Sequence, residues 1–381
     1  MKKIITFILS AAICLSIPIQ CCAEENSENK NENINAKAVV LMSIDTGEVL
    51  YQENEYEHLS PASVTKIMSI LLMLEALDNG DIALTDTVTA SKDAVSMGGS
   101  QIWLEVGEQM TVEELLKAVV VASANDACTA LGEFIGGSTT GFVKMMNDRA
   151  AELGLANTNF ENCTGLDDTV KNHYSCAYDL ALIASEVMKH DIITDYTTIW
   201  LDSLRNGETE LNNTNKLVNT YEGITGLKTG TTSNAGFCVA ATACRDNMNL
   251  VAVVLGADTS DERFDTASYL LDWGFANYQV ITPEIDDSKI TPVKVINGVF
   301  KELTPDIGST SKIVVKKGTE DISYKYVINE SVNAPVKKGD KVGEIKILSN
   351  KKEIGTIKLV SPNSIAQVTL KTIWHNIMIN I

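Results

Sequence analysis

The order of hydrophobic patterns along the chain is the feature that most constrains its fold. Alternation over residues 38–51, interrupted by Asp-Thr-Gly, predicts a strand, a turn and a second strand. Two further β-rich runs, at residues 236–246 and 248–257, are joined by an Asp-Asn turn. Helical periodicity occurs between these strand regions and once after them, at residues 61–79, 111–137, 140–154, 175–190 and 260–278. This order predicts one α+β domain whose first and last segments share an antiparallel sheet.

The last quarter of the chain differs in both pattern and charge. Residues 279–362 contain short alternating runs separated by Gly and Lys, which predicts a small all-β domain after a larger domain at residues 37–278. From Tyr278 onward there are fifteen Lys and no Arg against eleven Asp and Glu, a surplus of four positive charges. The whole chain has a formal net charge of −19. This charge argues against a nucleic-acid partner, because no basic surplus exists to neutralise phosphates.

Both ends of the chain have the composition of targeting segments. Residues 1–23 combine a basic start, an apolar run and a small-residue site, which is typical of a secretory signal peptide. Residues 24–36 are rich in Asn and Glu, which predicts a disordered tether. Apolar residues recur with a helical period over residues 363–381, which predicts an amphipathic helix. That helix either packs on its own domain or lies in a membrane interface. Its place at the very end of the chain and its Trp374 favour the membrane.

Five cysteines remain after the signal peptide: Cys128, Cys163, Cys176, Cys238 and Cys244. An odd number in an exported chain does not indicate a disulfide framework. No Cys-x-x-Cys motif occurs and the chain has 4 His, so a zinc site is not expected. We expect small buried thiols, no metal and no cofactor.

The first of three chemical motifs is Ser63-Val64-Thr65-Lys66, at the head of the apolar helix. Residues i and i+3 lie on one helix face, so Lys66 can hydrogen-bond the Ser63 hydroxyl. A serine hydroxyl becomes a good nucleophile when a base takes its proton. A lysine can be that base when burial or a neighbouring cation lowers its pKa. The start of a helix also offers free backbone N–H groups to a developing oxyanion.

The second motif is Ser123-Ala124-Asn125, inside a helical segment. The Ser123 hydroxyl can relay a proton to a leaving amine. The Asn125 amide offers both a donor and an acceptor, which suits a substrate amide.

The third motif is Lys228-Thr229-Gly230, on a predicted strand. Gly230 is expected to leave an edge strand bare, so that a substrate backbone can pair with it. Lys228 can serve as the cation beside Lys66. With the hydroxyls of Thr229 and Thr231, its charge also suits a terminal carboxylate.

Each motif alone is common by chance, but together and in this order they resemble the set of penicillin-binding proteins and class A β-lactamases. The resemblance extends to the stretches SPASVTKIM, SMGGSQIWLEVGE, LLKAVVVASANDAC and TGLKTGTTSNAGFC. With the all-β region and the amphipathic tail, the chain resembles a low-molecular-mass penicillin-binding protein. Within that family it looks like a D-alanyl-D-alanine carboxypeptidase of the sporulation-associated group of Gram-positive spore formers.

The resemblance implies a serine transpeptidase/β-lactamase-like domain, with helices on both faces of an antiparallel sheet. It implies an acyl-enzyme on Ser63, with Lys66 as proton acceptor and Ser123 as a further catalytic residue. The backbone N–H groups of Ser63 and Thr231 would form the oxyanion hole. The residues that the resemblance assigns to substrate binding are Asn125, Lys228, Thr229, Gly230 and Thr231. Some relatives place an arginine shortly before the third motif, where this chain has Thr214 and Lys216.

The resemblance also implies a substrate and a location. The substrate would be the stem pentapeptide of peptidoglycan, trimmed of its terminal D-alanine, and β-lactams would acylate the nucleophile. The enzyme would be exported, and the tail would hold it at the outer face of the cytoplasmic membrane.

Four alternatives compete with this prediction. A β-lactamase would need a glutamate that activates water, and Glu208 lies too close to the third motif for that role. A DD-endopeptidase has the same three motifs, so the sequence leaves it open. A non-catalytic cell-wall binding protein is disfavoured because every motif residue is present. A Ser-His-Asp hydrolase is disfavoured because the four His (His58, His173, His190 and His375) all lie outside the three motifs.

Overall fold

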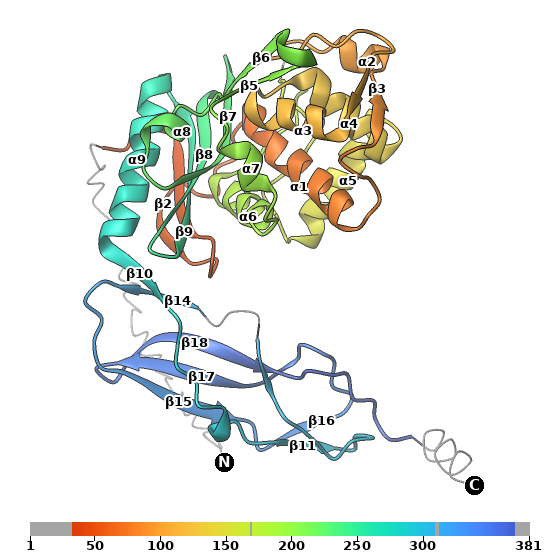
Figure 1. Ribbon diagram of the computed structural model, residues 1–381. Coiled ribbons are helices and arrows are strands. Elements are labelled where there is room, and N and C mark those ends of the chain that lie inside the picture. Colours follow the sequence, from red (N-terminus) through yellow and green to blue (C-terminus); the bar gives the residue numbers. More distant parts are fainter. Residues whose placement is uncertain (1–32, 168–169, 309–311, 370–381) are drawn as a thin grey trace, which may run out of the picture. The chain divides into compact units, whose positions relative to one another are not determined.

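The computed structural model describes residues 33–167, 170–308 and 312–369 (Figure 1). The predicted signal peptide (1–23), most of the predicted tether (24–36) and residues 370–381 of the predicted tail helix lie outside the described residues. The described residues from Asn35 to 369 belong to one unit of the chain, which contains the two domains below.

A five-stranded sheet lies at the centre of the first domain, in the order β2-β1-β9-β8-β7. All of its neighbouring strands are antiparallel, and β1 lies between β2 and β9, so the prediction that the first and last segments share a sheet is confirmed. Asp246 and Asn247 join β8 to β9 and both have positive φ, as a tight hairpin turn requires. The strands are β1 (Ala38–Ser43), β2 (Val49–Glu53), β7 (Ile224–Thr232), β8 (Gly236–Arg245) and β9 (Met248–Ala257).

Helices cover both faces of this sheet, as predicted. α9 (Ser260–Asn277) and α6 (Ala177–Val187) both contact β1, β8 and β9, and they lie on opposite sides of those strands (Figure 1). α1 (Lys66–Asp78) is buried at every residue from Lys66 to Leu74, which is typical of a helix at the centre of a core. It packs against α6, α3, α4 and α5.

The remaining elements of this domain are short, apart from α5. α5 starts before the predicted Thr140, because the Ser138 side chain caps it by accepting from the N–H of Gly141. The elements are β3 (Thr87–Thr89), α2 (Lys92–Val95), β4 (Gln109–Thr111), α5 (Thr139–Glu152), α7 (Ile193–Thr197), β5 (Leu201–Leu204), η2 (Arg205–Gly207), β6 (Thr209–Asn212) and α8 (Leu217–Thr220).

The segment 111–137, predicted as one helical run, is two helices. α3 (Val112–Val121) starts at a capping box, with reciprocal bonds between Thr111 and Glu114. The chain then breaks, because Ser123 adopts a left-handed conformation with φ of 60°. α4 (Asn125–Gly136) begins directly after it, and the Asn125 N–H donates to Ser100 O at 2.7 Å instead of to a helical carbonyl. The second motif therefore lies at a helix–helix junction.

The second domain is all β, as predicted. A four-stranded sheet in the order β13-β18-β17-β15 forms one core, and a three-stranded sheet, β12-β11-β16, forms another. Its elements are β10 (Tyr278–Ile281), η3 (Asp287–Lys289), β11 (Val293–Ile296), β12 (Glu302–Leu303), β13 (Asp306–Ile307), β14 (Ile313–Lys316), β15 (Ile322–Ile328), β16 (Ser331–Asn333), β17 (Lys341–Ser349) and β18 (Lys352–Val360).

The prediction that the tail helix begins at residue 363 is wrong for residues 363–369. Residues 363–369 are extended, with Ile365 paired to Val336 and Gln367 paired to Gly298. The physical reason is burial: Ile365 is 4% exposed and belongs to the core of the β domain. Among the helices of the described ranges, none combines the length and the apolar character needed to cross a bilayer.

The described cysteines are free thiols. Cys128, Cys163, Cys176 and Cys238 are buried and Cys244 is half-buried. The expectation of small buried thiols is confirmed for these four.

Candidate active site

Ser63 lies in a single 3₁₀ turn, η1 (Ala62–Thr65), that leads directly into α1. In a 3₁₀ helix the side chains at i and i+3 eclipse each other, so Lys66 lies directly beneath Ser63. The Lys66 Nζ donates to Ser63 Oγ at 2.9 Å and to the carbonyl oxygen of Thr164 at 2.9 Å. The predicted contact between the first and last residues of the motif is therefore present.

Lys66 is fully buried, and burial lowers its pKa to about 8. Removing an ammonium from water disfavours its charged form, and the opposing effect of Cys128 and Cys163 is smaller. About a tenth of Lys66 is then neutral at pH 7, and about half at pH 8. A neutral amine 2.9 Å from a hydroxyl can accept its proton.

The nucleophile turn is held between two glycines. At Gly165, which has φ of +83°, a Cβ atom would overlap the carbonyl oxygen of Ala62. At Gly230, a Cβ would lie 2.7 Å from Pro61 O and 2.8 Å from the backbone nitrogen of Ser63. Gly230 was expected to make room for a substrate backbone. Its missing side chain instead makes room for η1, which brings the edge strand β7 onto the nucleophile turn.

The second motif offers two polar atoms that have no partner. Ser123 and Asn125 are buried, and neither Ser123 Oγ nor Asn125 Oδ1 has a hydrogen-bond partner within the described residues. The Asn125 amide is oriented by its Nδ2, which donates to Gly98 O at 2.6 Å. Buried polar atoms left without partners are costly, and a ligand with matching groups would satisfy them.

Lys228 is as deeply buried as Lys66, and its Nζ donates to the carbonyl oxygen of Thr229 at 3.1 Å. Burial and then repulsion by Lys66 lower the pKa of Lys228 well below its usual range. Lys228 was expected to be the cation that lowers the pKa of Lys66, but burial is the main cause of that shift. The Thr229 hydroxyl donates to Thr214 Oγ1 at 2.7 Å.

Arg263 is a site residue that the sequence did not reveal. Its guanidinium donates to Thr231 Oγ1 at 3.0 Å and to Gly230 O at 3.1 Å. The rings of Phe264 and Phe237 lie 4.5 and 5.5 Å from it. Burial lowers the pKa of Arg263 to about 10, so it remains a cation at neutral pH. It comes from α9, and no spacing rule connects it to the third motif.

Lys216, which stands near the place where some relatives have arginine, does not contact the motif residues. Its Nζ lies 3.5 Å from Asp261 Oδ1, and both side chains are largely exposed. The structure therefore places a positive charge beside Thr231 through Arg263 and not through Lys216.

The histidine nearest to the motif has a structural role. His173 Nδ1 accepts from the N–H of Glu161 at 3.0 Å, so its Nε2 carries the proton and donates to Thr65 Oγ1 at 2.8 Å. Burial lowers the pKa of His173 to about 4, which keeps the ring neutral. A catalytic histidine would contact Ser63, but the partner of His173 is Thr65.

The described part of the chain gives no support to Glu208 as a water-activating glutamate or to a metal site. Glu208 is exposed in the turn between β5 and β6, where a solvated acid is expected. His, Cys, Asp and Glu side chains of the described ranges form no group of three or more that could hold a metal ion.

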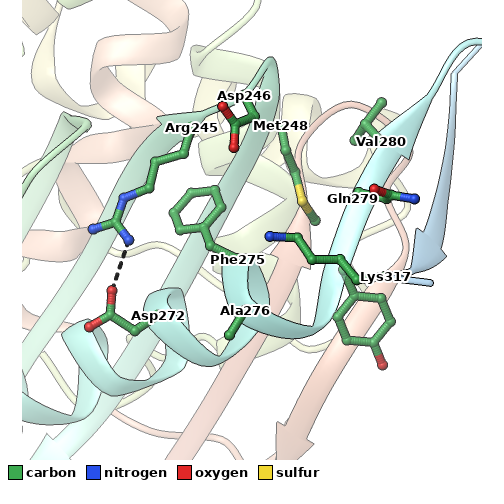
Figure 2. A pocket seen from close by; sticks show the side chains of 10 residues that line it. Arg245, Asp246, Met248, Asp272, Phe275, Ala276, Gln279, Val280 and Lys317 are labelled. Atoms are coloured by element: carbon green, nitrogen blue, oxygen red, sulfur yellow. Dashed lines mark hydrogen bonds and ion pairs between the residues drawn. The ribbon is translucent and has the colours of Figure 1, made fainter.

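A hollow of about 510 Å³ lies away from the motifs, beside the end of α9 (Figure 2). Arg245 lines it and pairs with Asp272 at 3.0 Å, with the rings of Tyr221 and Phe275 at 4.6 and 4.9 Å. None of the motif residues lines this hollow. The guanidinium of Arg245 is already paired with Asp272.

Comparison with known proteins agrees with this geometry. Residues 24–259 match the family described as D-alanyl-D-alanine carboxypeptidase, and residues 278–367 match the penicillin-binding protein 5 C-terminal domain. The chain is 40% identical to D-alanyl-D-alanine carboxypeptidase DacF of Bacillus subtilis, over 95% of this chain and 93% of that protein. It is 35% identical to DacC of Escherichia coli, over 91% and 87% of the two chains.

Solved structures show the same likeness. Penicillin binding protein 5 from Haemophilus influenzae superposes with a TM-score of 0.75 at 31% identity, covering 88% of this chain and 98% of that one. Penicillin-binding protein D2 from Listeria monocytogenes, solved in an ampicillin-bound form, has a TM-score of 0.58 at 31% identity and covers 64% and 98% of the two chains. By family match, identity and coverage, the chain belongs to the serine-type D-alanyl-D-alanine carboxypeptidases among the low-molecular-mass penicillin-binding proteins.

Proposed function

We propose that Ser63 is the nucleophile of this carboxypeptidase and Lys66 its general base. The observation that carries this proposal is the 2.9 Å contact between Lys66 Nζ and Ser63 Oγ, made by a lysine that is fully buried and whose pKa is lowered to about 8. A base poised near the operating pH transfers protons most effectively.

In the acylation step, Ser63 Oγ attacks the carbonyl carbon between the last two D-alanines of a peptidoglycan stem peptide. The hydroxyl proton passes to Lys66 as the ester bond forms. The peptide C–N bond then breaks, and the leaving amine takes a proton through Ser123, whose Oγ has no other partner in the described residues. Water later hydrolyses the ester, which releases the shortened peptide and regenerates the serine.

Two groups of donors are proposed to bind the substrate around this step. The backbone N–H groups of Ser63 and Thr231 would stabilise the oxyanion, because Gly230 brings β7 against η1. The terminal carboxylate would lie at Thr231, where Arg263 supplies a cation at hydrogen-bond distance. Asn125, Lys228 and Thr229 would complete the binding surface.

The proposal extends to antibiotics and location. A related structure, from Listeria, holds ampicillin, and we propose that β-lactams acylate Ser63 in this chain as well. We also propose that the chain is exported by residues 1–23 and held at the outer face of the cytoplasmic membrane by residues 370–381.

The test is intact-mass analysis after penicillin exposure, run in parallel with D-alanine release from a pentapeptide. One penicillin adduct on the wild-type chain, absent from Ser63→Ala together with D-alanine release, supports the nucleophile. An adduct of unchanged size on Ser63→Ala would place the nucleophile elsewhere. Cleavage of cross-linked dimers in preference to D-alanine release would show an endopeptidase on the same residues.

A further inference from the structure

The β domain carries an unusual concentration of exposed apolar side chains. Within the described residues of that domain, the exposed large apolar side chains are Ile296 (46%), Val299 (37%), Phe300 (65%) and Val327 (37%). Three of these four lie in residues 296–300, at the junction of β11 with the turn toward β12. We call residues 296–300 the Phe300 turn.

The Phe300 turn has a fixed shape. Asn297 has a positive φ of 58°, and Gly298 is buried. A Cβ at Gly298 would lie 2.8 Å from the carbonyl oxygen of Phe300 and 3.1 Å from the side chain of Ile365. The turn is therefore closed tightly against the core of the domain, and its exposed side chains are presented by a constrained backbone.

The turn is bonded to the segment that leads into the tail. The N–H of Val299 donates to Ala366 O at 3.0 Å, and the N–H of Val368 donates to Asn297 O at 2.8 Å. Two residues after Val368 the sequence continues as residues 370–381, which include Leu370, Ile373, Trp374, Ile377 and Ile381. The exposed apolar turn is thus fixed beside the point from which the apolar tail departs.

Charge favours an anionic surface as the occupant. The part of the chain from Tyr278 onward has four more positive than negative charges, although the whole chain has a net charge of −19. Lys294 and Lys301 flank the turn and are exposed. Lysines at this position suit phosphate headgroups, and apolar side chains suit the region just beneath them.

The hollow next to the turn does not suit an apolar helix. It has a volume of about 620 Å³ and is lined by Phe300 and Leu303, but also by Glu302, Thr304 and several polar residues of 361–364. An amphipathic tail would have to bury apolar side chains against these polar groups. A lipid interface accepts both the apolar side chains and the lysines.

We propose that the Phe300 turn is a second lipid-contact element, which inserts Ile296, Val299 and Phe300 into the interface of an anionic bilayer beside the tail. This inference rests on the membrane attachment proposed above. The turn gives the β domain a fixed orientation on the bilayer that a tail alone does not provide, because two separate contacts restrict rotation.

The test measures binding of the full mature chain to vesicles of phosphatidylglycerol and phosphatidylethanolamine by flotation. Phe300→Ser is expected to weaken binding about tenfold, because one large apolar side chain no longer enters the interface. Val299→Ser is expected to weaken it about threefold. Val327→Ser is the matched control, since Val327 has the same 37% exposure in the same domain but lies outside the turn. Its binding should stay within about twofold of wild type.

Several outcomes would overturn the inference. Equal binding of Phe300→Ser, Val299→Ser and Val327→Ser would show that the turn does not touch lipid. Concentration-dependent dimers that Phe300→Ser abolishes, without a change in vesicle binding, would make the turn a protein interface. Wild-type chain that releases D-alanine but binds no vesicles would overturn the membrane contact and leave the catalytic proposal intact.

A chain ending at residue 369 separates the two elements. If it binds vesicles weakly and Phe300→Ser removes that residual binding, the turn acts independently of the tail, as proposed. If it shows no change on Phe300→Ser, the turn has no lipid contact of its own. D-alanine release from a soluble peptide should be unaltered in every variant, and an unchanged circular dichroism spectrum and thermal unfolding curve would show that the mutated β domain is folded.

Discussion

Ser63 and Lys66 owe their geometry to a local change of helix type. Three-residue spacing predicts one shared helix face, and the sequence supports that much. The 3₁₀ turn η1 goes further, because eclipsed side chains place the Lys66 amine directly beneath the Ser63 hydroxyl at 2.9 Å. The sequence does not show this turn, since its residues fit an α-helix equally well.

The lowered pKa of Lys66 gives a prediction for the rate profile. With a pKa of about 8, kcat/KM for D-alanine release should rise with pH through a midpoint of about 8 as Lys66 becomes neutral. Lys66→Arg, which stays protonated, should lose at least about 100-fold in kcat/KM. Stopped assays from pH 6 to 10 would measure both.

Lys144→Ala is the control for that experiment, because the Lys144 side chain is 75% exposed and pairs with Asp148. It should keep the wild-type profile. A Lys66→Arg enzyme with an undiminished rate would remove Lys66 from the role of base.

His173 predicts a loss of stability in acid. Its pKa is lowered to about 4 in the folded chain, against about 6.5 for an unperturbed histidine, so the fold favours the neutral ring. The resulting stabilisation is complete above pH 6.5 and is lost as the pH falls toward 4. Its size is about 3 kcal/mol. Urea unfolding between pH 7 and 4 should show a steeper loss of stability in the wild type than in His173→Gln, and parallel curves would contradict the assignment.

At the scale of elements, the site is assembled by close backbone contacts. η1 lies between Gly165 and Gly230, and neither contact leaves room for a side chain. The third motif was correctly predicted to lie on an edge strand, but the reason for its glycine was not. A sequence shows that a glycine is present and does not show which backbone lies against it.

Gly165→Ala should be severely destabilising. Its positive φ disfavours any side chain, and a Cβ would also collide with the Ala62 carbonyl that precedes the nucleophile. Gly80→Ala is the matched control, since Gly80 also has a positive φ (+75°) but has no atom within 4 Å of a built Cβ. Thermal unfolding should show a cost of about 1–2 kcal/mol for Gly80→Ala and at least about twice that for Gly165→Ala. Equal costs would mean that the contact with η1 is not rigid.

The errors of the sequence-based prediction have a common physical origin. The hydrophobic pattern predicted one helical run over residues 111–137. The run is interrupted at Ser123, because the N–H of Asn125 bonds to the distant Ser100 carbonyl and not to a helical carbonyl. Residues 363–369 have helical periodicity but are extended, because Ile365 is buried in the β domain. Arg263 joins the site from a distant helix. Periodicity reports local preference, and these three features depend on contacts between distant segments.

For the molecule as a whole, pattern and charge were sufficient to separate two domains. The switch from helical to short alternating runs near residue 278 coincides with the switch from a negative to a positive charge balance. Each region is matched by its own family, at residues 24–259 and 278–367. A domain division predicted from composition over long segments is reliable because it depends on no single tertiary contact.

Catalysis should therefore persist without the β domain. Penicillin-binding protein D2 of Listeria matches 64% of this chain over 98% of its own length, so relatives of about this size fold alone. A chain limited to residues 24–277 should form the penicillin adduct within about threefold of the full-length rate and should lose vesicle binding. Intact-mass kinetics and flotation would measure the two properties. A truncated chain that folds by circular dichroism yet forms no adduct would show that the β domain supports the site.

The close packing of Gly165 and Gly230 against η1 has a consequence for the order of events during folding. Ser63 and Lys66 are neighbours in sequence, so their turn closes at little entropic cost. Gly165 and Gly230 lie about a hundred residues or more further along the chain, and η1 is enclosed only on their arrival. Before that arrival Lys66 is an ordinary solvated ammonium and Ser63 an ordinary alcohol. On the proposed mechanism, a newly made chain is thus inert toward peptide substrate and toward β-lactams until its last long-range contacts form, and reactivity itself marks the completed fold.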